Sequence, residues 1–334
     1  MAQQLSIPIQ PVENPILCSP YREPDQHWLY DTRTGVPTRT PGRRPASYWF
    51  KSERSGSAQQ QMSFLAEEER DDLPLVNALR DDVRRWRAGG WENASETTKK
   101  LLRHWWRDDR GRRLFFCQVE AAETIIYLRE LLALGKTPRW TPKLTLKDFN
   151  TLCQGRNPRP EEWVAKLAQH PKLADIPNEP GAKAIHRYAC KMATGSGKTV
   201  VMAMLISWAF CNRGTKPGDP RFPRRALVVC PNLTIKERLS VLRPGYPNNY
   251  YEQFDIVPSS LRPELAKGKV LVTNWHWLTP EAEVQNVGGA SIVKLGVESA
   301  EAFARNRLGD LWDEEPLMVL NDEGHRVHSR KEGT

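Results

Sequence analysis

A glycine-rich segment at residues 193–199 has the residue types of a loop that wraps around phosphate groups. Gly195 and Gly197 tolerate backbone angles that other residues avoid, so the main chain can curl closely around an anion. The segment follows an apolar stretch and opens a helical one, which is the setting that a P-loop needs to stabilise negative charge. The residues expected to hold the phosphates are Ala193, Thr194, Gly195, Ser196, Gly197, Lys198 and Thr199.

Two side chains in this loop indicate the ligand. Lys198 is expected to reach the β- and γ-phosphates of ATP, and the hydroxyl of Thr199 is expected to ligate Mg²⁺. Met192 stands where such loops usually have Gly or Ala, but that position shapes the entry turn and needs no side-chain contact with phosphate. The alternative is an accidental Gly/Ser loop, which the apolar run before it and the helix after it disfavour.

Two adjacent carboxylates follow the apolar run at residues 317–320. Asp322 would hold Mg²⁺ through its water shell, and Glu323 would take a proton from the attacking water as a general base. His325 would lie near the γ-phosphate and could couple the nucleotide state to the rest of the molecule. An acidic pair is by itself more often a solvated turn, but its place after an apolar strand, downstream of the P-loop, favours a nucleotide site.

The elements that must position these residues begin near residue 186. Apolar runs at 188–192, 226–230, 270–273 and 317–320 alternate with helical segments at 198–211 and 233–241. Apolar strands that are covered on both faces by helices predict a parallel sheet. The predicted fold class is therefore α/β, with a RecA-like P-loop sheet as an ATP-binding lobe over residues 183–334.

The sequence before this lobe divides into three parts. Residues 1–66 are rich in prolines and basic residues, and they predict an irregular basic arm. Residues 67–134 predict a helical region, in which apolar residues recur every three or four positions and Ser95 can cap a helix. Residues 135–182 read as a Pro-rich connector with one helix at 161–169.

Composition narrows the class of protein. The net charge of +9 suits a polyanionic partner such as nucleic acid, but a merely soluble basic protein fits equally well. The six cysteines are scattered without a C-x-x-C pair, which indicates reduced thiols and neither a disulfide framework nor a zinc site. No apolar run approaches the roughly 20 residues that span a bilayer, and the N-terminus lacks a signal-peptide pattern. We expect a cytoplasmic protein that does not contact membranes.

Together these motifs resemble those of superfamily 2 helicases and translocases with a DExH box, and most closely the Res subunits of type III restriction enzymes. The resemblance is closest from residue 186 onward and weaker upstream, at 42–46 and 115–118. It rests on five segments, at residues 191–204, 227–239, 249–258, 272–276 and 319–326.

The resemblance implies an ATP-driven motor that acts on double-stranded DNA. Its DNA-facing positions are here Pro231, Asn232, Thr234, Lys236, Thr273, Asn274 and His276. Small hydroxyls, amides and N–H groups suit contacts to phosphate, which set register without reading sequence. For Lys236 and Arg238 a solvated helix face is an equally good interpretation. Trp275 and Trp277 could stack on bases, although a core role is favoured.

Gln118 is a candidate for the glutamine that reads adenine in a Q motif. A carboxamide can pair with both the N6 donor and the N7 acceptor of adenine. Gln118 lies much farther before Lys198 than is usual, which the connector at 135–182 could explain. The alternative is a glutamine that merely starts a helix.

The resembled enzymes contain parts that do not occur in these 334 residues. These are a Ser-Ala-Thr motif, a second RecA-like lobe with arginine fingers and a nuclease domain, and a modification methyltransferase is a further partner. We therefore expect an N-terminal fragment or truncated product with low stability and little turnover. Three readings stay open: a restriction-type DNA translocase, a general DExH helicase without a restriction role, and a nucleotide- or nucleic-acid-binding fragment that does not hydrolyse ATP.

Overall fold

The computed structural model describes residues 11–31, 34–51, 68–136, 138–153, 187–278, 299–312 and 316–324. Its internal contacts divide the chain into two compact units. Unit 1 consists of residues 1–93 and 115–187, and unit 2 consists of residues 94–114 and 188–334. Each unit is described by itself.

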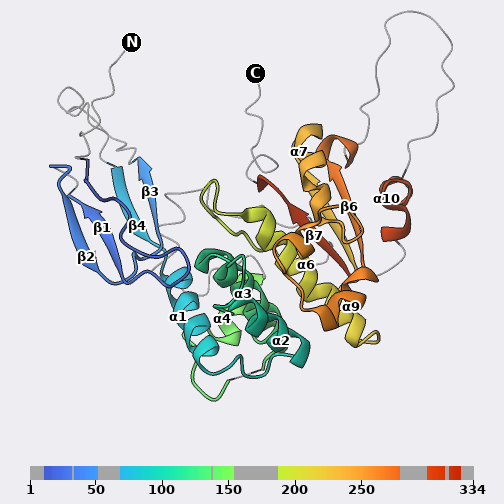
Figure 1. The fold of residues 1–334 in the computed structure, drawn as a ribbon, viewed down its shortest axis with the longest axis horizontal. Coiled ribbons are helices and arrows are strands. Elements are labelled where there is room, and N and C mark those ends of the chain that lie inside the picture. Colours follow the sequence, from blue (N-terminus) through green and yellow to red (C-terminus); the bar gives the residue numbers. More distant parts are fainter. Residues whose placement is uncertain are drawn as a thin grey trace, which may run out of the picture. The chain divides into compact units, whose positions relative to one another are not determined.

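Unit 2 is built on a parallel sheet of three strands, β5 (Arg225–Cys230), β6 (Lys269–Asn274) and β7 (Leu317–Asn321). The strand order is β6-β5-β7, so β5 is central (Figure 1). Val229 pairs with Thr273 on one side and with Asn321 on the other, so the three strands end at the same level. These strands confirm the predicted parallel α/β sheet, and they bring their carboxyl ends to one edge.

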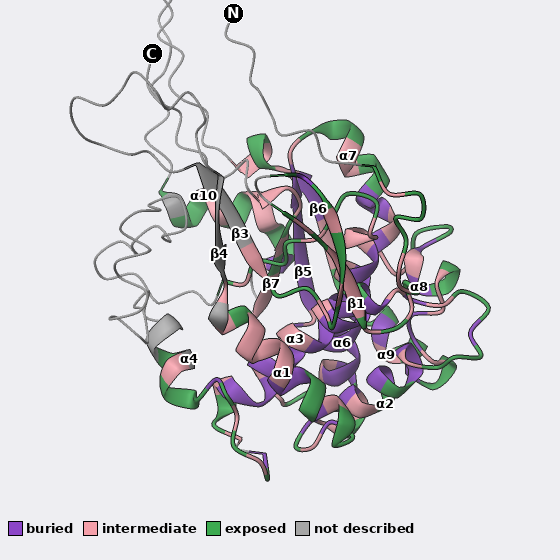
Figure 2. Ribbon diagram, turned by 90° about the vertical axis from the view of Figure 1, so that its left-hand side faces the viewer, coloured by how far each residue is buried: buried purple, intermediate pink, exposed green. Residues whose placement is uncertain are grey.

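Both faces of the central strand are covered. All six residues of β5 are buried, and Figure 2 shows the strand in the colour of buried residues. On one face, Leu227 and Val229 form a core cluster with Leu311. The partly buried residues packed against this cluster are Leu271, Leu278, Leu308 and Leu317. A continuous apolar strand needs such two-sided cover to be stable in water.

The longest described helix of unit 2 is α6 (Lys198–Thr215), which begins directly after the glycine-rich loop. Its residues Met204, Ile206 and Phe210 are almost fully buried. A Cβ atom at Gly268, just before β6, would lie only 2.0 Å from the Phe210 ring. A glycine is therefore needed there for α6 to approach the start of β6.

Shorter elements complete unit 2. Helix α7 (Leu233–Arg238) and the 3-10 turn η3 (Leu239–Leu242) follow β5, where the helix 233–241 was predicted. The remaining elements are α8 (Tyr250–Gln253), η4 (Ser259–Leu261), α9 (Arg262–Ala266), η5 (Trp275–Leu278), α10 (Ala300–Leu308) and η6 (Gly309–Leu311).

Helix α2 (Glu96–Trp105) belongs to unit 2 although it precedes the lobe in sequence. As predicted, Ser95 caps it, with its Oγ accepting the N–H of Thr98 at 3.0 Å. Asn212 of α6 donates to the Thr98 hydroxyl at 2.9 Å, and Trp105 Nε1 donates to the carbonyl of Ile256 at 2.8 Å. These long-range bonds attach residues 94–114 to the lobe, whereas the sequence suggested one helical region over 67–134.

The strand expected at residues 188–192 is not formed, since the structure gives these residues no strand pairing. The residues of this segment are exposed or half-buried, so it does not occupy the buried position that an apolar strand of a parallel sheet takes. Both edges of β5 are occupied by β6 and β7. Among the described residues, the outer edge of β7 pairs with no further strand.

The helices of unit 1 are α1 (Pro74–Ala88), α3 (Phe116–Glu130), the 3-10 turn η1 (Leu132–Leu134) and α4 (Leu146–Cys153). Trp86 and Tyr127 are fully buried and meet edge to face, with ring centroids 5.5 Å apart. The fully buried carboxylate of Glu123 accepts bonds from Arg87 at 2.7 Å and from Trp91 Nε1 at 2.8 Å. This buried charge is thereby paired, as burial requires.

Residues 26–72 differ from the predicted irregular arm at 1–66 and from the start of the predicted helical region at 67–134. Strands β1 (Gln26–Tyr30) and β2 (Pro37–Pro41) pair antiparallel, and β3 (Ser47–Lys51) pairs with β4 (Glu68–Asp72). The sequence did not predict these strands, because β2 contains two prolines and β4 consists of charged residues, and both kinds of residue are uncommon in strands.

The predicted helix at 161–169 lies outside the described residues. No described helix is both long and apolar enough to cross a bilayer.

Candidate nucleotide-binding site

The glycine-rich loop has the backbone shape that an anion-binding loop needs. Gly195 has a φ of +79° and Gly197 a φ of +83°, which residues with a Cβ rarely adopt. The Ser196 hydroxyl donates to the carbonyl of Ala193 at 2.6 Å and closes the turn. A Cβ at Gly195 would meet no atom within 4 Å, so the space beside the loop is open. Gly197 is the N-cap of α6, whose first-turn N–H groups face this loop.

The structure brings Lys198 and Glu323 together. Nζ of Lys198 lies 3.7 Å from Oε1 of Glu323, although 124 positions separate Lys198 from the neighbouring Asp322. The two side chains are 35% and 33% exposed, so both are accessible to a ligand. Glu323 has a φ of +55°, an uncommon angle for a residue other than glycine. Such local strain is typical of functional sites.

Asp322 continues the sheet by one position, because its N–H donates to the Val229 carbonyl at 2.8 Å. Burial raises the pKa of its carboxyl group, and the negative charge of Glu323 raises this pKa further. The positive charges of Lys198 and Arg238 act in the opposite direction. Two adjacent carboxylates at a half-buried position would be stabilised by a cation placed between them.

These groups fit a magnesium–nucleotide complex. A lysine, a hydroxyl at Thr199 and two carboxylates are the donor types that hold phosphate and Mg²⁺. Among the described residues, no cluster of three or more His, Cys, Asp or Glu could bind a metal ion. Mg²⁺ typically takes one or two protein carboxylates and completes its shell with water and phosphate oxygens, which matches this donor set.

The predicted DNA-facing residues lie at the same carboxyl edge of the sheet. Cys230 pairs with Asn274 in the β5–β6 register, so the segment that starts at Pro231 leaves the sheet beside Asn274. Asn232 Oδ1 accepts the N–H of Ile235 at 2.9 Å, and Asn274 Oδ1 accepts the N–H of Trp277 at 3.1 Å. Both amides therefore shape the turns that follow their strands.

The remaining DNA-facing candidates differ in accessibility. Thr234 and His276 are exposed and Lys236 is half-buried, but Thr273 is only 3% exposed. Its hydroxyl lies 3.4 Å from the Asn274 carbonyl, so a phosphate contact through the Thr273 side chain would need this region to open. The DNA-contacting roles of all these residues stay predictions.

A family model for the type III restriction enzyme res subunit matches residues 154–333, which is more than half of the chain. The chain belongs to this family. Its matched region is a helicase-like domain of superfamily 2, which agrees with a P-loop and a carboxylate pair at the edge of a parallel sheet. No curated protein and no solved structure matches the chain.

Two predicted residues, Gln118 and His325, are not among the described residues of unit 2. Gln118 belongs to unit 1, where it is 6% exposed and its Oε1 accepts the N–H of Phe115 at 2.9 Å. That bond caps α3, which was the alternative interpretation of this glutamine, and a role in reading adenine stays a prediction. His325 lies outside the described residues.

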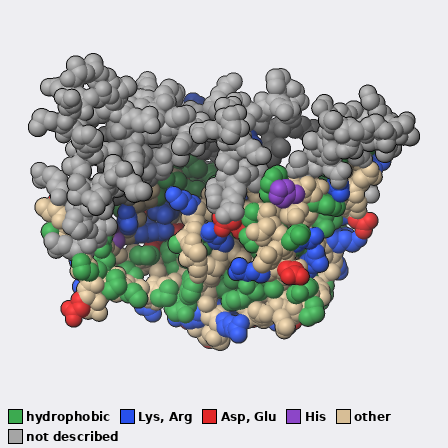
Figure 3. All heavy atoms as spheres, turned by 90° about the horizontal axis from the view of Figure 1, so that it is seen from above, with side chains coloured by type: hydrophobic (Ala, Val, Ile, Leu, Met, Phe, Trp, Pro, Cys, Tyr) green, Lys and Arg blue, Asp and Glu red, His purple; other side chains and the backbone are tan. Residues whose placement is uncertain are grey.

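The structure also indicates Arg238, for which the sequence made a solvated helix face and a DNA contact equally good interpretations. Its positive charge reaches the carboxyl group of Asp322. The position of Arg238 in the helix after β5 is the only signal that the sequence contained. Figure 3 shows that Lys and Arg side chains are spread among hydrophobic ones on the described part of one face, where acidic side chains are few.

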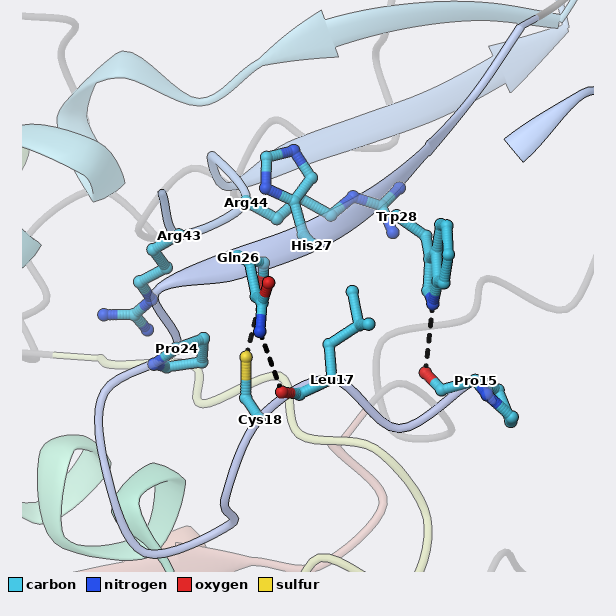
Figure 4. Close-up of a pocket in the computed structure, with 9 residues that line it drawn as sticks. All are labelled: Pro15, Leu17, Cys18, Pro24, Gln26, His27, Trp28, Arg43 and Arg44. Atoms are coloured by element: carbon cyan, nitrogen blue, oxygen red, sulfur yellow. Dashed lines mark hydrogen bonds between the residues drawn. The ribbon is translucent and has the colours of Figure 1, made fainter. Parts of the chain in front are cut away.

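Unit 1 contains a separate cavity of about 360 Å³ around β1 (Figure 4). Two of its polar side chains donate hydrogen bonds to neighbouring backbone. Trp28 Nε1 donates to the Pro15 carbonyl at 3.2 Å, and Gln26 Nε2 donates to the Leu17 carbonyl at 3.0 Å. These bonds fix the segment before β1 against the hairpin, and they give the cavity a structural explanation.

Proposed function

We propose that this chain contains the ATP-binding, RecA-like lobe of an ATP-driven DNA translocase or helicase in a type III-like restriction endonuclease. The observation that carries the proposal is the approach of Lys198, at the start of α6, to Glu323, at the end of β7. A P-loop lysine contacts the phosphates and the carboxylates of a Walker B strand serve the same nucleotide, so their proximity supports one shared site.

Each residue then has a role. The loop backbone from Ala193 to Gly197 holds the phosphate groups, and Lys198 neutralises their charge. Thr199 and Asp322 hold Mg²⁺, which when bound neutralises charge on the phosphates. Glu323 orients the attacking water and accepts its proton.

Double-stranded DNA is the proposed substrate. The candidates at the sheet edge present amides, hydroxyls and the cation of Lys236, which suit sequence-independent phosphate contacts. In the complete enzyme we propose that a second RecA-like lobe, a nuclease domain and a methyltransferase subunit act with this lobe. The family membership supports the restriction role over a general DExH helicase.

The proposal is tested by ATP hydrolysis with the chain in excess over radiolabelled ATP, with and without duplex DNA. We expect slow hydrolysis that duplex DNA accelerates and that Lys198→Ala abolishes. Lys216→Ala is the matched control, because Lys216 is exposed at the other end of the same helix. Nucleotide binding that depends on Lys198 but gives no hydrolysis under any condition would favour the non-hydrolysing alternative. Hydrolysis that persists in Lys198→Ala would refute the assigned site.

A further inference from the structure

An exposed aromatic pair follows strand β6. The rings of Trp275 and His276 are in tilted contact, with centroids 3.6 Å apart and planes inclined by 30°. Trp275 is 39% exposed, and His276 is also exposed. Tryptophan side chains are on average largely buried in folded domains, so a partly exposed indole in contact with an exposed imidazole is a candidate for binding a ligand.

Side-chain contacts hold the turn that carries this pair. Asn274 Oδ1 accepts the N–H of Trp277 at 3.1 Å, which fixes the course of η5 after the strand. The guanidinium of Arg307 on α10 lies 5.4 Å from the centroid of the Trp277 ring and 5.3 Å from that of Phe303. Cation–π contacts at these distances stabilise the packing of α10 against η5. The turn that carries Trp275 and His276 is therefore packed against α10.

This arrangement separates the two tryptophans, for which the sequence favoured a core role. Trp277 is half-buried and packs against Arg307, in keeping with that expectation. Trp275, in contrast, is exposed. It lies directly after Asn274, at the edge of the sheet where the DNA-facing candidates occur. Helix α7, which carries Lys236, contacts β6.

We infer that Trp275 and His276 form a stacking platform for an unpaired base of single-stranded DNA. This inference rests on the proposed DNA motor function. The face of an aromatic ring stacks on any base, independent of sequence. A base within a duplex already has both faces covered by its neighbours, so the platform selects unpaired DNA, as at a transiently opened or displaced strand.

The inference is tested by measuring DNA binding with fluorescence anisotropy. A fluorescein-labelled thymidine oligonucleotide of about 20 nucleotides is compared, as a single strand, with the same strand in a duplex. Trp275→Ala is expected to weaken binding of the single strand about tenfold, which is the scale of one lost base stack. Trp275→Phe keeps an aromatic face and should recover most of that loss. Duplex affinity should change by less than about twofold in both variants.

Tyr246→Ala is the matched control, because Tyr246 is 41% exposed in the same unit and lies in the segment between η3 and α8. It should bind both DNA forms like the parent. The platform would be refuted if Trp275→Ala lost equal affinity for the single strand and the duplex, or lost affinity for neither. It would also be refuted if the parent chain did not bind the single strand. Binding of ATP by the same preparations reports on the proposed function separately, since Trp275 is not part of the nucleotide site.

Discussion

Nζ of Lys198 lies 3.7 Å from Oε1 of Glu323, which connects the first turn of the P-loop helix α6 to the end of strand β7. Both side chains are about one third exposed, so the solvent-screened attraction between them is weak. A phosphate group can therefore displace Glu323 from Lys198 at little cost. The carboxylate would stay beside the phosphate, where a group that activates water is needed.

Replacing Glu323 with glutamine should separate binding from hydrolysis. The amide keeps the size of the side chain but cannot accept the proton of the attacking water. We expect Glu323→Gln to bind ATP at least as tightly as the parent, because it removes a charge that competes with phosphate for Lys198. Hydrolysis should fall by roughly 10²-fold or more, measured with the chain in excess over ATP. A parent-like rate would show that Glu323 is not the base.

We expect the Asp322 carboxylate to lower the stability of the ligand-free chain although it is needed to hold Mg²⁺. Burial and the charge of Glu323 raise its pKa, so the folded state favours the protonated acid. The sign follows from linkage: stability falls as pH rises from the ordinary pKa of 3.8 through the raised one, and the cost persists at neutral pH. We expect Asp322→Asn to raise the melting temperature of the ligand-free chain by roughly 1–3 °C. The same variant should lose most of the additional stabilisation that Mg²⁺ with ATP gives the parent. Thermal unfolding with and without the ligand checks both, and a variant less stable than the parent would contradict the argument.

The sequence predicted those parts of the site that are formed by residues close to one another along the chain. Gly195, Gly197 and Lys198 lie within a few residues of one another, and their backbone shape follows from the requirements of the loop itself. The strands β5, β6 and β7 were also predictable, since each is a continuous apolar run between polar segments.

Long-range relationships were less predictable. The segment at 188–192 has the apolar pattern of a strand, but its residues are exposed or half-buried, and burial depends on how the rest of the chain packs. The attachment of α2 to α6 depends on polar side chains such as Asn212 and Thr98, for which periodicity gives no signal. Strands β2 and β4 contain prolines and charged residues respectively, so their pairing outweighs unfavourable local propensities.

His104 makes the stability of unit 2 depend on pH. Its Nε2 lies 2.7 Å from the Asp255 carbonyl oxygen, to which the neutral ring donates, and Arg107 lies 3.4 Å from its Nδ1. Burial lowers the pKa of His104 below 6.5, a shift that the Asp255 bond and carboxylate partly oppose and that the charges of Arg110 and Arg107 reinforce. Because the folded-state pKa is lowered, this contribution is present above pH 6.5 and is lost as the pH falls.

We expect the melting temperature of the parent to decrease between about pH 7.5 and pH 5.5 by roughly 2–4 °C more than that of His104→Gln. Glutamine can still donate to the Asp255 carbonyl but does not titrate. Other titrating groups act equally in both proteins and cancel in the comparison. Identical pH profiles would exclude His104 as the source.

Gln118 can be tested in a way that separates its two roles. Gln118→Glu keeps an oxygen that can accept the Phe115 N–H, and its negative charge suits a helix N-terminus. It loses the amide N–H that adenine N7 would accept. If Gln118 reads adenine as the sequence predicts, the variant should keep the melting temperature of the parent to within about 1 °C while its preference for ATP over GTP falls severalfold. An unchanged preference would leave Gln118 with the capping role alone.

The central claim is that residues 193–199 bind the phosphates of ATP, and calorimetric titration with Mg²⁺ and ATP tests it most directly. The account predicts saturable binding by the parent chain and by Lys216→Ala, with an affinity at least about tenfold weaker in Lys198→Ala, the loss expected when a charge-assisted contact to phosphate is removed. Equal affinity of Lys198→Ala and the parent, or a parent chain that binds no nucleotide, would contradict the account.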